Sequence, residues 1–330
     1  MVERLIQSNY KFARDSPGNF ELVYHLQNGQ LLHRYRDNSA PGTPWSPPTA
    51  TITSNAISAG SIIQSKPGTP GSNGGLEVIV VEKNPSNPDR GNLVRYYRAT
   101  VDSSWAGPEL ITQNATGPGS IVQSTYGNPE AGNFEVVVQE GKDNLVHYFR
   151  NNSSTEQPWS GPTATITSNA NGSASIIQSK PDTPGSNGGL EVVVLEGNGN
   201  LNRYYRPSPT DFWHGPENIV SDAEGPGSLI QSTYETPPGN FEVIFPRGSS
   251  LIHYYRDNIR EPTLPWKPSN PPFAPGTTAP GSLIQSTYQV PNNPSNFEAV
   301  VIEVKDLNHY TRNNGVAAQT WTKDETITTV

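Results

Sequence analysis

The chain has 330 residues, a formal net charge of −8 and a hydrophobic fraction of 32%. It contains no cysteine, which excludes disulfides, thiolate catalysis and cysteine-ligated zinc. No cluster of lysine or arginine offers a phosphate-binding surface, so we expect no nucleic-acid partner. No apolar stretch approaches the roughly 18 residues that a membrane-spanning helix needs, so we expect no membrane insertion. No signal peptide precedes the first predicted strand, and we expect the protein in the cytoplasm or released/secreted.

Two residue types recur with one period along the whole chain. The tryptophans are Trp45, Trp105, Trp159, Trp213, Trp266 and Trp321. The glutamines are Gln7, Gln64, Gln123, Gln178, Gln231 and Gln285. A period of about 55 residues is typical of repeat arrays and closed rings. We therefore expect one domain of six repeats, with approximate bounds 1–58, 59–116, 117–171, 172–224, 225–278 and 279–330.

The third repeat shows the predicted elements most clearly. Residues 120–126 form a short first strand, and 133–138, rich in β-branched residues, form a second. A turn at 141–144 leads to a third strand at 145–150, and 163–167 form a fourth. No segment has a helical apolar period. Four antiparallel strands per unit, repeated radially, predict an all-β fold, a six-bladed β-propeller. Closure of the ring with or without a shared strand stays open.

The repeats fall into two types. Segment 45–56 recurs almost intact at 159–170, and segment 61–82 recurs at 175–196. Units 1, 3 and 5 form one type, units 2 and 4 form another, and unit 6 resembles the odd type at 285–288. Duplication of a two-unit piece explains this pattern.

Charged residues occupy fixed places in the predicted strands. Each second strand has a glutamate: Glu21, Glu77, Glu135, Glu191, Glu242 and Glu298. Each third strand has a basic residue: His33, Arg95, His147, Arg203, His253 and His309. An arginine follows three residues later: Arg36, Arg98, Arg150, Arg206, Arg256 and Arg312. Charges on adjacent strands can pair across a sheet. Either they form a buried, hydrogen-bonded ladder, or they form the polar floor of a ligand site.

The aromatic and amide residues also allow two interpretations each. The tryptophan before each fourth strand either packs the unit or adds a platform on which a sugar ring stacks, as in an aromatic-walled pocket. The Asp/Asn-Asn pair after the third strand, absent from units 2 and 4, either turns the chain or touches a ligand. The first-strand glutamine is expected to bond neighbouring backbone near the ring axis rather than a ligand.

Catalysis is not expected. Each candidate acid, base or cation recurs in every unit, whereas an enzyme needs one asymmetric constellation. No metal-binding motif is present. We expect no catalytic residue, no cofactor and no metal, and we find no residue set that would turn the central tunnel into an active site.

Strand 133–138, strand 145–150 and the following Trp159 together resemble the β-propeller lectins of the Psathyrella velutina / Photorhabdus lectin type, which have seven blades. Six blades and a similar length also resemble the fucose-binding lectins like that of Aleuria. Those place arginine on the second strand and glutamate on the third, the reverse of the order here. The resemblance implies glycan partners (fucose, N-acetylglucosamine or O-methylated sugars) and sugar sites in clefts between or at the edges of blades.

We therefore expect a multivalent carbohydrate-binding protein. The alternative is a non-catalytic protein-interaction scaffold or the targeting domain of a toxin or adhesin. The candidate ligand-binding residues are Trp45, Trp105, Trp159, Trp213, Trp266, Trp321, Tyr35, Tyr97, Tyr205, Tyr255, Arg36, Arg98, Arg150, Arg206, Arg256 and Arg312. We expect the odd-type units to bind best and the two even units mainly to complete the ring; the oligomeric state stays open.

Overall fold

The computed structural model describes residues 4–10, 16–154, 156–234, 237–259, 265–269, 271–277, 279–288 and 295–330. Their regular structure consists of β-strands that pair antiparallel with their neighbours, as the sequence predicts. Among these residues no helix has the length and apolar character needed to cross a membrane.

The strands form four sheets of four strands and one sheet of eight. The first sheet contains β1 (Arg4–Gln7), β2 (Phe20–His25), β3 (Leu31–Arg36) and β4 (Ala50–Thr53). The eight-stranded sheet contains β5 (Ser61–Gln64), β6 (Leu76–Lys83), β7 (Gly91–Arg98), β8 (Ala106–Ala115), β9 (Ser120–Gln123), β10 (Asn133–Glu140), β11 (Asn144–Asn151) and β12 (Ser160–Thr167). The other three contain β13 (Ala170–Gln178), β14 (Leu190–Glu196), β15 (Leu201–Arg206) and β16 (His214–Val220); β17 (Ser228–Gln231), β18 (Phe241–Arg247), β19 (Ser250–Arg256) and β20 (Lys267–Pro268); and β21 (Ser282–Ser286), β22 (Asn296–Glu303), β23 (Asp306–Arg312) and β24 (Trp321–Thr329).

The third repeat folds into the strands predicted for it. Strands β9 to β12 cover each predicted segment, although β9 ends at Gln123, before the expected end at 126. The fourth strand is the weakest element of the repeat, because it shrinks in the fifth unit to the two residues of β20. Pro265 and Pro268 flank or enter that strand, and proline cannot donate to a sheet ladder.

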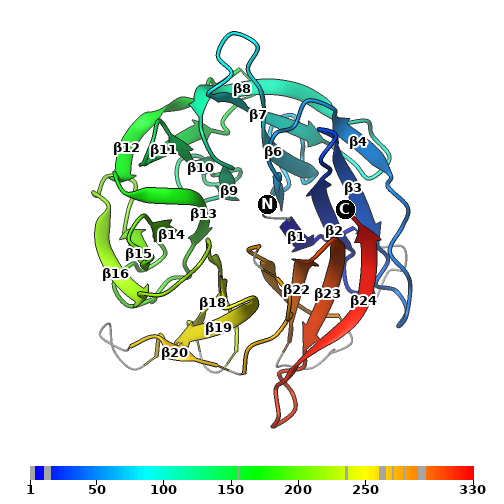
Figure 1. The fold of residues 1–330 in the computed structure, drawn as a ribbon. Coiled ribbons are helices and arrows are strands. Elements are labelled where there is room, and N and C mark those ends of the chain that lie inside the picture. Colours follow the sequence, from blue (N-terminus) through cyan, green and yellow to red (C-terminus); the bar gives the residue numbers. More distant parts are fainter. Residues whose placement is uncertain are drawn as a thin grey trace.

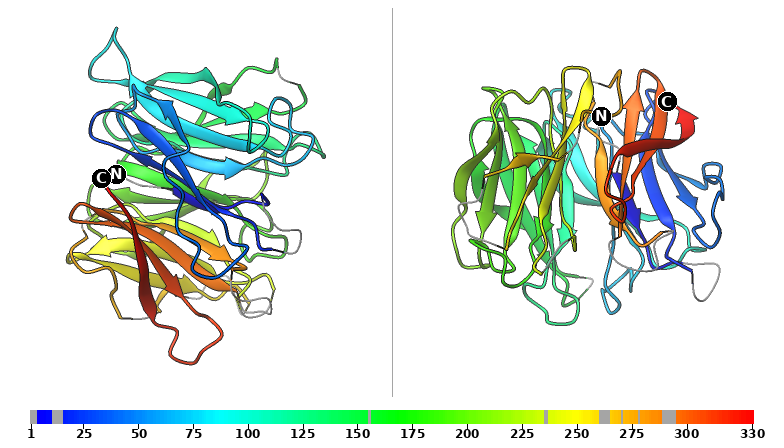
Figure 2. Two further views of the ribbon diagram at one scale, coloured as in Figure 1. Left: turned by 90° about the vertical axis from the view of Figure 1, so that its right-hand side faces the viewer. Right: turned by 90° about the horizontal axis from the view of Figure 1, so that it is seen from below.

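The sheets stand around a central axis and form a β-propeller (Figure 1). The innermost strands β1, β5, β9, β13, β17 and β21 each contact the two that flank them in the ring. Figure 2 places the first and last described residues on the same face of the ring. The ring closes without a shared strand among the described residues: Leu5 N donates to Ser282 Oγ at 3.0 Å, and Arg34 Nη1 donates to Ile327 O at 2.9 Å.

The apolar core lies between successive four-stranded repeats rather than within one. In one cluster Ile79 and Leu93 pack with Phe134 and Val136 of the following strands. Five further clusters repeat this arrangement around the ring, and one of them joins the last strands to the first. A four-stranded sheet leaves both faces apolar, so each unit needs a neighbour on either side.

The first-strand glutamines form a hydrogen-bonded belt around the axis. Gln123 Oε1 accepts the backbone N–H of Lys66, which lies one unit earlier, at 2.7 Å. The same bond recurs from Asn9 to Gln64, Thr125 to Gln178, Lys180 to Gln231, Thr233 to Gln285 and Thr287 to Gln7. The last of these crosses the closing point of the ring. The prediction that these glutamines bond neighbouring backbone is confirmed.

Candidate functional site

The predicted ladder between the second and third strands is present. Each first basic residue contacts the glutamate of its own unit: His33–Glu21 2.8 Å, Arg95–Glu77 2.7 Å, His147–Glu135 2.9 Å, Arg203–Glu191 2.7 Å, His253–Glu242 2.9 Å and His309–Glu298 3.1 Å. All of these side chains are buried. Burial of a charge is tolerated where a partner holds it. The predicted hydrogen-bonded ladder is therefore present, and a role of these residues as the floor of a ligand site stays a prediction.

The tryptophan of a unit faces the preceding unit, and so does the second arginine, with the exception of Arg206. Arg150 of β11 reaches Glu109 of β8, and Trp213 packs edge-on against His147 at 5.7 Å between ring centroids. The candidate sites are therefore clefts shared by two units. We number the units by their strands, β1–β4 being unit 1 and β21–β24 unit 6, and we name each cleft by its two units, from cleft 1/2 to cleft 6/1.

Cleft 1/2 contains a pocket between its two units. It encloses about 490 Å³ and is lined by Thr49 and Ile52 of unit 1 and by Arg98, Asp102 and Trp105 of unit 2, among others. The Arg98 guanidinium lies 5.2 Å from the Trp105 ring centroid, within cation–π range. An aromatic wall, a cation and polar groups therefore meet in one concavity.

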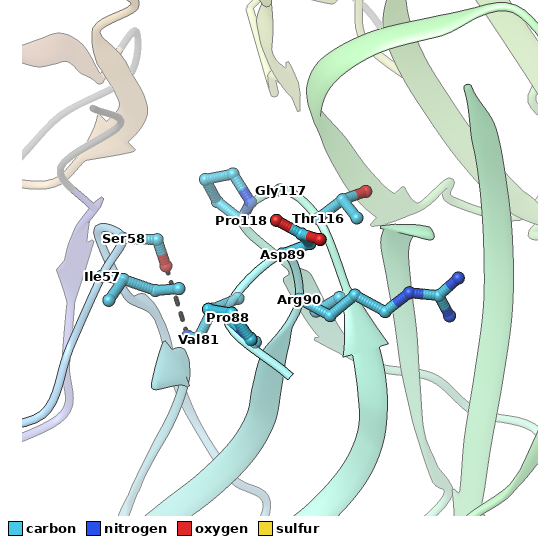
Figure 3. A pocket seen from close by; sticks show the side chains of 11 residues that line it. Ile57, Ser58, Val81, Pro88, Asp89, Arg90, Thr116, Gly117 and Pro118 are labelled. Atoms are coloured by element: carbon cyan, nitrogen blue, oxygen red, sulfur yellow. Dashed lines mark hydrogen bonds between the residues drawn. The ribbon is translucent and has the colours of Figure 1, made fainter. Parts of the chain in front are cut away.

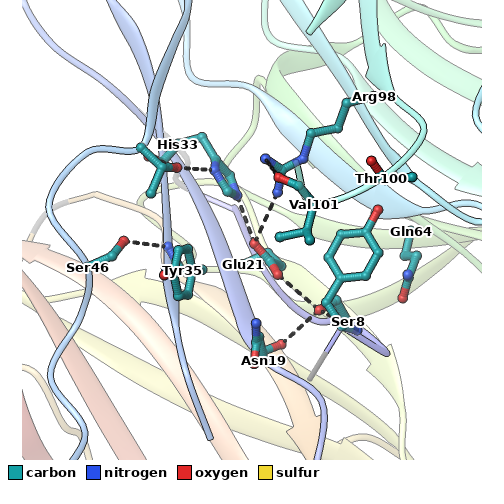
Figure 4. A network of polar contacts seen from close by, with 12 residues as sticks. Ser8, Asn19, Glu21, His33, Tyr35, Ser46, Gln64, Arg98, Thr100 and Val101 are labelled. Atoms are coloured by element: carbon teal, nitrogen blue, oxygen red, sulfur yellow. Dashed lines mark hydrogen bonds and ion pairs between the residues drawn. The ribbon is translucent and has the colours of Figure 1, made fainter. Parts of the chain in front are cut away.

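Beside this pocket His33 and Arg98 converge on the fully buried Glu21 (Figure 4). His33 Nε2 contacts Glu21 Oε2 at 2.8 Å, and His33 Nδ1 lies 2.8 Å from Thr49 Oγ1. Burial lowers the pKa of His33 more than the bond to Glu21 raises it, so the imidazole is neutral at pH 7. Arg98 is left as the cation of this cleft.

Arg98 is 5% exposed and incompletely bonded. Its Nη1 donates to Val101 O at 3.2 Å, and its Nη2 lies 3.8 Å from Glu21 Oε2. Within the described residues neither Nε nor Nη2 has a hydrogen-bond partner, and the same holds for Trp105 Nε1. Burial lowers the pKa of Arg98, with Glu21 opposing the shift. Buried donors without acceptors are costly, and a ligand with acceptor oxygens would satisfy them.

Clefts 2/3 and 4/5 are filled by a glutamate. Glu109 accepts from Arg150 Nη1 with both oxygens, at 2.9 and 3.0 Å, and from Arg95 Nη1 at 2.6 Å. In cleft 4/5 Glu217 makes the same bonds with Arg256, at 3.0 and 3.1 Å, and with Arg203.

Trp266 Nε1 also donates to Glu217, at 3.0 Å. Burial raises the pKa of this carboxyl, but the charges of Arg203 and Arg256 outweigh burial and lower it. Glu217 is therefore ionised, and Glu109 and Glu217 are each bound by arginines of two successive units.

Cleft 6/1 contains an ion network at the closing point of the ring. Arg36 Nη1 contacts Asp324 at 3.0 Å and Glu325 at 3.1 Å, and Arg36 Nη2 donates to Tyr288 OH at 3.0 Å. His309, Asp324 and Glu325 could present metal ligands within 4.8 Å of one another. Since the guanidinium already bridges both carboxylates, we interpret the cluster as ion pairs.

The pKa of His309 differs from those of His33 and His253 in the direction of its shift. Burial lowers its pKa, but hydrogen bonds to Asp324 and Glu298 outweigh burial and raise it to about 8. The bond to His309 in turn lowers the pKa of Asp324 to about 2. In contrast, burial lowers the pKa of His253. The closing cleft therefore holds a protonated imidazole at neutral pH.

Clefts 5/6 and 3/4 depart from both patterns. In cleft 5/6, Arg312 donates to His253 Nδ1 and Ser269 Oγ, both at 2.9 Å, and to Gln319 Oε1 at 2.6 Å, beside a pocket of about 150 Å³. In cleft 3/4 the arginine is missing, because half-buried Arg206 turns into its own loop and donates to Asp211 O at 2.9 Å. Cleft 1/2 is distinguished by an inward arginine with two nitrogens, Nε and Nη2, that lack hydrogen-bond partners among the described residues, whereas Arg36, Arg150, Arg256 and Arg312 each have one such nitrogen.

The structure distributes the predicted ligand residues as follows. Trp45 and Trp266 are buried, and the other four tryptophans are half-buried. The tyrosines Tyr35, Tyr97, Tyr205 and Tyr255 are half-buried beside the ladder. Tyr97 stacks on Arg95 at 4.3 Å and Tyr205 on Arg203 at 4.6 Å. All six tryptophans pack between units, and their role in binding stays a prediction.

The prediction that odd units bind best assumed that each site lies within one unit. Trp105 and Arg98 of even unit 2 instead share a cleft with Thr49 of odd unit 1. Each candidate site is therefore formed by two successive units, and binding cannot be assigned to odd or even units alone.

Sequence reasoning missed the residue four places after each tryptophan. It is Thr49, Glu109, Thr163 and Glu217 in units 1 to 4. This residue determines whether a carboxylate or a hydroxyl faces the cleft with the next unit. The alternation of Thr and Glu with unit type was the available signal.

The Asn after the third strand is a turn residue. Asn38 Nδ2 donates to Gly18 O at 2.8 Å, and Asn258 Nδ2 donates to Gly239 O at 2.9 Å. Asn152 is fully buried as well. These amides fasten neighbouring loops, which agrees with the turn-forming interpretation.

A further pocket lies on the opposite face of the ring (Figure 3). It encloses about 280 Å³ and is lined by loops after β4, β6 and β8, including Ile57, Asp89, Arg90 and Pro118. Second and fourth strands end on one face and third strands on the other, because neighbours run antiparallel. This pocket is therefore separate from the clefts.

Comparison with known proteins finds similarity in structure alone. No protein-family model matches the chain, and no curated protein matches its sequence. The BP39L lectin of Burkholderia pseudomallei matches with a TM-score of 0.63 at 16% identity, covering 95% of this chain and 82% of that one. A variant of the Aleuria aurantia lectin, solved with Fucα1-6GlcNAc, matches with a TM-score of 0.66 at 13% identity, covering 99% and 94%.

The SapL1 lectin, solved with alpha methyl fucoside, matches with a TM-score of 0.64 at 11% identity, covering 98% of this chain and 95% of that one. Another structure of the Aleuria lectin is described as a six-bladed β-propeller. At such identities the likeness shows the fold, and it confirms the predicted all-β propeller.

Proposed function

We propose that the chain is a carbohydrate-binding protein, a lectin, whose sugar sites lie in clefts between successive units. The observation that carries the proposal is cleft 1/2, where the buried Arg98 retains unused donors beside Trp105 and above Glu21. A concave site with an aromatic wall and a few convergent polar groups is typical of small-molecule recognition.

The chemistry of cleft 1/2 suits a neutral sugar. Arg98 Nε and Nη2 would donate to ring or hydroxyl oxygens, and Glu21 Oε2, 3.8 Å from Arg98, would accept from a hydroxyl. The apolar face of the sugar would lie against Trp105. Glu21 and the exposed Asp102 already offset the charge of Arg98 while His33 is neutral, so the ligand need not supply a negative charge.

Fucose is the first saccharide to test. The Aleuria and SapL1 lectins, which share the fold, were solved with fucosides. N-acetylglucosamine and O-methylated sugars stay predictions that rest on the resemblance to the Psathyrella velutina / Photorhabdus type. Membership of the Psathyrella velutina / Photorhabdus type also stays a prediction. It is favoured by the order of glutamate and basic residue here, which differs from the Aleuria pattern.

We also propose that the ring has six blades within one domain, each a unit of four strands. The eight-stranded sheet then counts as two blades, because the strand pairing between its halves consists of the single pair Ala115 and Glu140. Six apolar clusters, each between two successive units, support this count. In this view the protein is non-catalytic and is located in the cytoplasm or released.

A glycan array followed by isothermal titration calorimetry tests the function. We expect binding of fucosides or another neutral saccharide with at least one site per chain. Individual sites would be weak, and any multivalency would arise from repeated clefts. If no fucose, N-acetylglucosamine or O-methylated glycan binds, the proposal is overturned in favour of a protein-interaction scaffold.

A further inference from the structure

Two clefts contain, in place of a ligand, an oxygen pair supplied by the protein. In cleft 2/3 the two oxygens of Glu109 both accept from Arg150, at 2.9 and 3.0 Å, and Glu217 repeats this on Arg256 in cleft 4/5. In cleft 1/2 the corresponding residue is Thr49, whose hydroxyl lies 2.8 Å from His33 Nδ1. Arg98 therefore has no such acceptor.

The exchange between the two types of cleft conserves charge. Units 2 and 4 pair an arginine on the third strand with a glutamate on the fourth: Arg95 with Glu109 at 2.6 Å, and Arg203 with Glu217. Unit 1 has neutral His33 with neutral Thr49 at the same places. The arginine–glutamate pair and the histidine–threonine pair each have zero net charge. One pair can therefore replace the other without leaving a buried charge unpaired. The two types of cleft differ instead in whether a carboxylate faces the arginine of the next unit.

We infer that Glu109 and Glu217 act as built-in occupants that close clefts 2/3 and 4/5 to saccharides, and that threonine at this place opens a cleft. The inference rests on the proposed function. In cleft 1/2 two neighbouring oxygens of the ligand, as in a vicinal diol, accept hydrogen bonds from the guanidinium of Arg98, as the carboxylate oxygens of Glu109 do from Arg150. The number of working sites is then set by this fourth-strand residue together with the inward arginine, and not by the number of tryptophans.

The test exchanges the pairs between clefts in the full chain. The opening variant carries Arg95→His with Glu109→Thr, and the closing variant carries His33→Arg with Thr49→Glu. Isothermal titration calorimetry with methyl α-L-fucoside and methyl α-N-acetylglucosaminide counts the sites. We expect the opening variant to gain one site and the closing variant to lose the site of cleft 1/2.

A matched control repeats the closing exchange where no inward arginine exists. His147→Arg with Thr163→Glu alters cleft 3/4, in which Arg206 bonds its own loop. We expect the stoichiometry of this variant to equal that of the wild type. Indole N–H resonances report the location: Trp105 shifts on titration in the wild type, and Trp159 shifts only in the opening variant.

The outcomes separate the two proposals. No binding of any glycan by the wild type would overturn the function and the inference together. Binding by the wild type with unchanged stoichiometry in the folded opening and closing variants would overturn the inference alone. If the opening variant does not fold, the closing variant decides. Loss of the site of cleft 1/2 in the closing variant, while the control variant keeps its sites, supports the inference. A closing variant that keeps this site overturns it. Preference for methyl galacturonate over the neutral glycosides would overturn the vicinal-diol assignment.

Discussion

At the scale of single residues, one residue type at one repeated position behaves differently according to its acceptor. Arg150 is bound by both oxygens of Glu109 and leaves only Nη2 without a hydrogen-bond partner in the described residues, whereas Arg98 at the equivalent position leaves both Nε and Nη2 without one. The sequence predicted the arginines and the ladder because strand neighbours are close in sequence. It did not predict which arginine is satisfied, because the acceptor belongs to the preceding unit, roughly 40 residues earlier, and its identity matters only once the ring has formed.

The first prediction separates binding from stability with two substitutions at equivalent positions. Arg98→Met removes the bond to Val101 O and the 3.8 Å ion pair with buried Glu21, and should cost about 2 kcal/mol or more of unfolding free energy. Arg150→Met leaves Glu109 short of a partner and should cost about 2 kcal/mol or more. Saccharide affinity should fall at least about tenfold in Arg98→Met and stay unchanged in Arg150→Met. Urea unfolding and calorimetry measure both, and equal affinity in the two variants would contradict the assignment of cleft 1/2.

At the scale of elements, the strands follow from local pattern, but the polar links between them do not. Alternating β-branched residues bounded by Gly, Pro and Asn define β10 and β11 almost to the residue. A second inter-unit link escaped prediction: Glu82 accepts from Tyr96 OH at 2.7 Å and from Thr53 of the preceding unit. The partners lie on three different strands, so no spacing within one segment reveals them.

The second prediction concerns the glutamine belt. Gln123 accepts from Lys66 N and donates to Thr69 Oγ1 at 2.8 Å, so Gln123→Ala leaves a backbone donor near the axis without its acceptor. We expect a loss of about 1 to 3 kcal/mol in the free energy of unfolding. Gln113→Ala, at an exposed position of β8, is the control and should change stability by less than about 0.5 kcal/mol. Equal effects of the two substitutions would show that the belt adds no stability.

At the scale of the whole molecule, closure of the ring is the step that local sequence cannot encode. Period and strand pattern predicted a propeller, but they left open how its ends meet. The structure joins them by side-chain packing, by Leu5 N to Ser282 Oγ and by the belt bond from Thr287 N to Gln7. Unit 6 also differs from the odd units that it resembles in sequence, since Asp324 and Glu325 bind Arg36 across the closing cleft.

The third prediction is a pH dependence of the closing cleft. The folded-state pKa of His309, about 8, exceeds its unfolded value of 6.5, so the folded state binds more protons between these pH values. The stabilisation, about 2 kcal/mol, is therefore complete below pH 6.5 and is lost as pH rises through 8. Asp324→Asn removes one cause of the raised pKa and should flatten this slope in urea unfolding curves measured from pH 6 to 9. An unchanged slope in the variant would refute the assignment.

The fourth prediction tests whether the apolar interface between units 6 and 1 is as stable as the interface between units 2 and 3. Val300 of β22 belongs to the cluster that joins unit 6 to unit 1, and Val136 of β10 belongs to a cluster between units 2 and 3. Both side chains are fully buried. Removal of two buried methyl groups should cost about 2 to 3 kcal/mol at either place, through lost burial and the cavity left behind.

Val316→Ala, at a position 48% exposed, serves as the control and should cost less than about 0.5 kcal/mol. A closed ring has no weak interface, so Val300→Ala and Val136→Ala should lower the unfolding free energy equally and preserve a single cooperative transition. A loss at Val300 no larger than at Val316 would mean that units 1 and 6 separate in solution before the rest of the ring unfolds. Cleft 6/1, which needs Arg36 and Asp324 from the two ends of the chain, would then exist only part of the time.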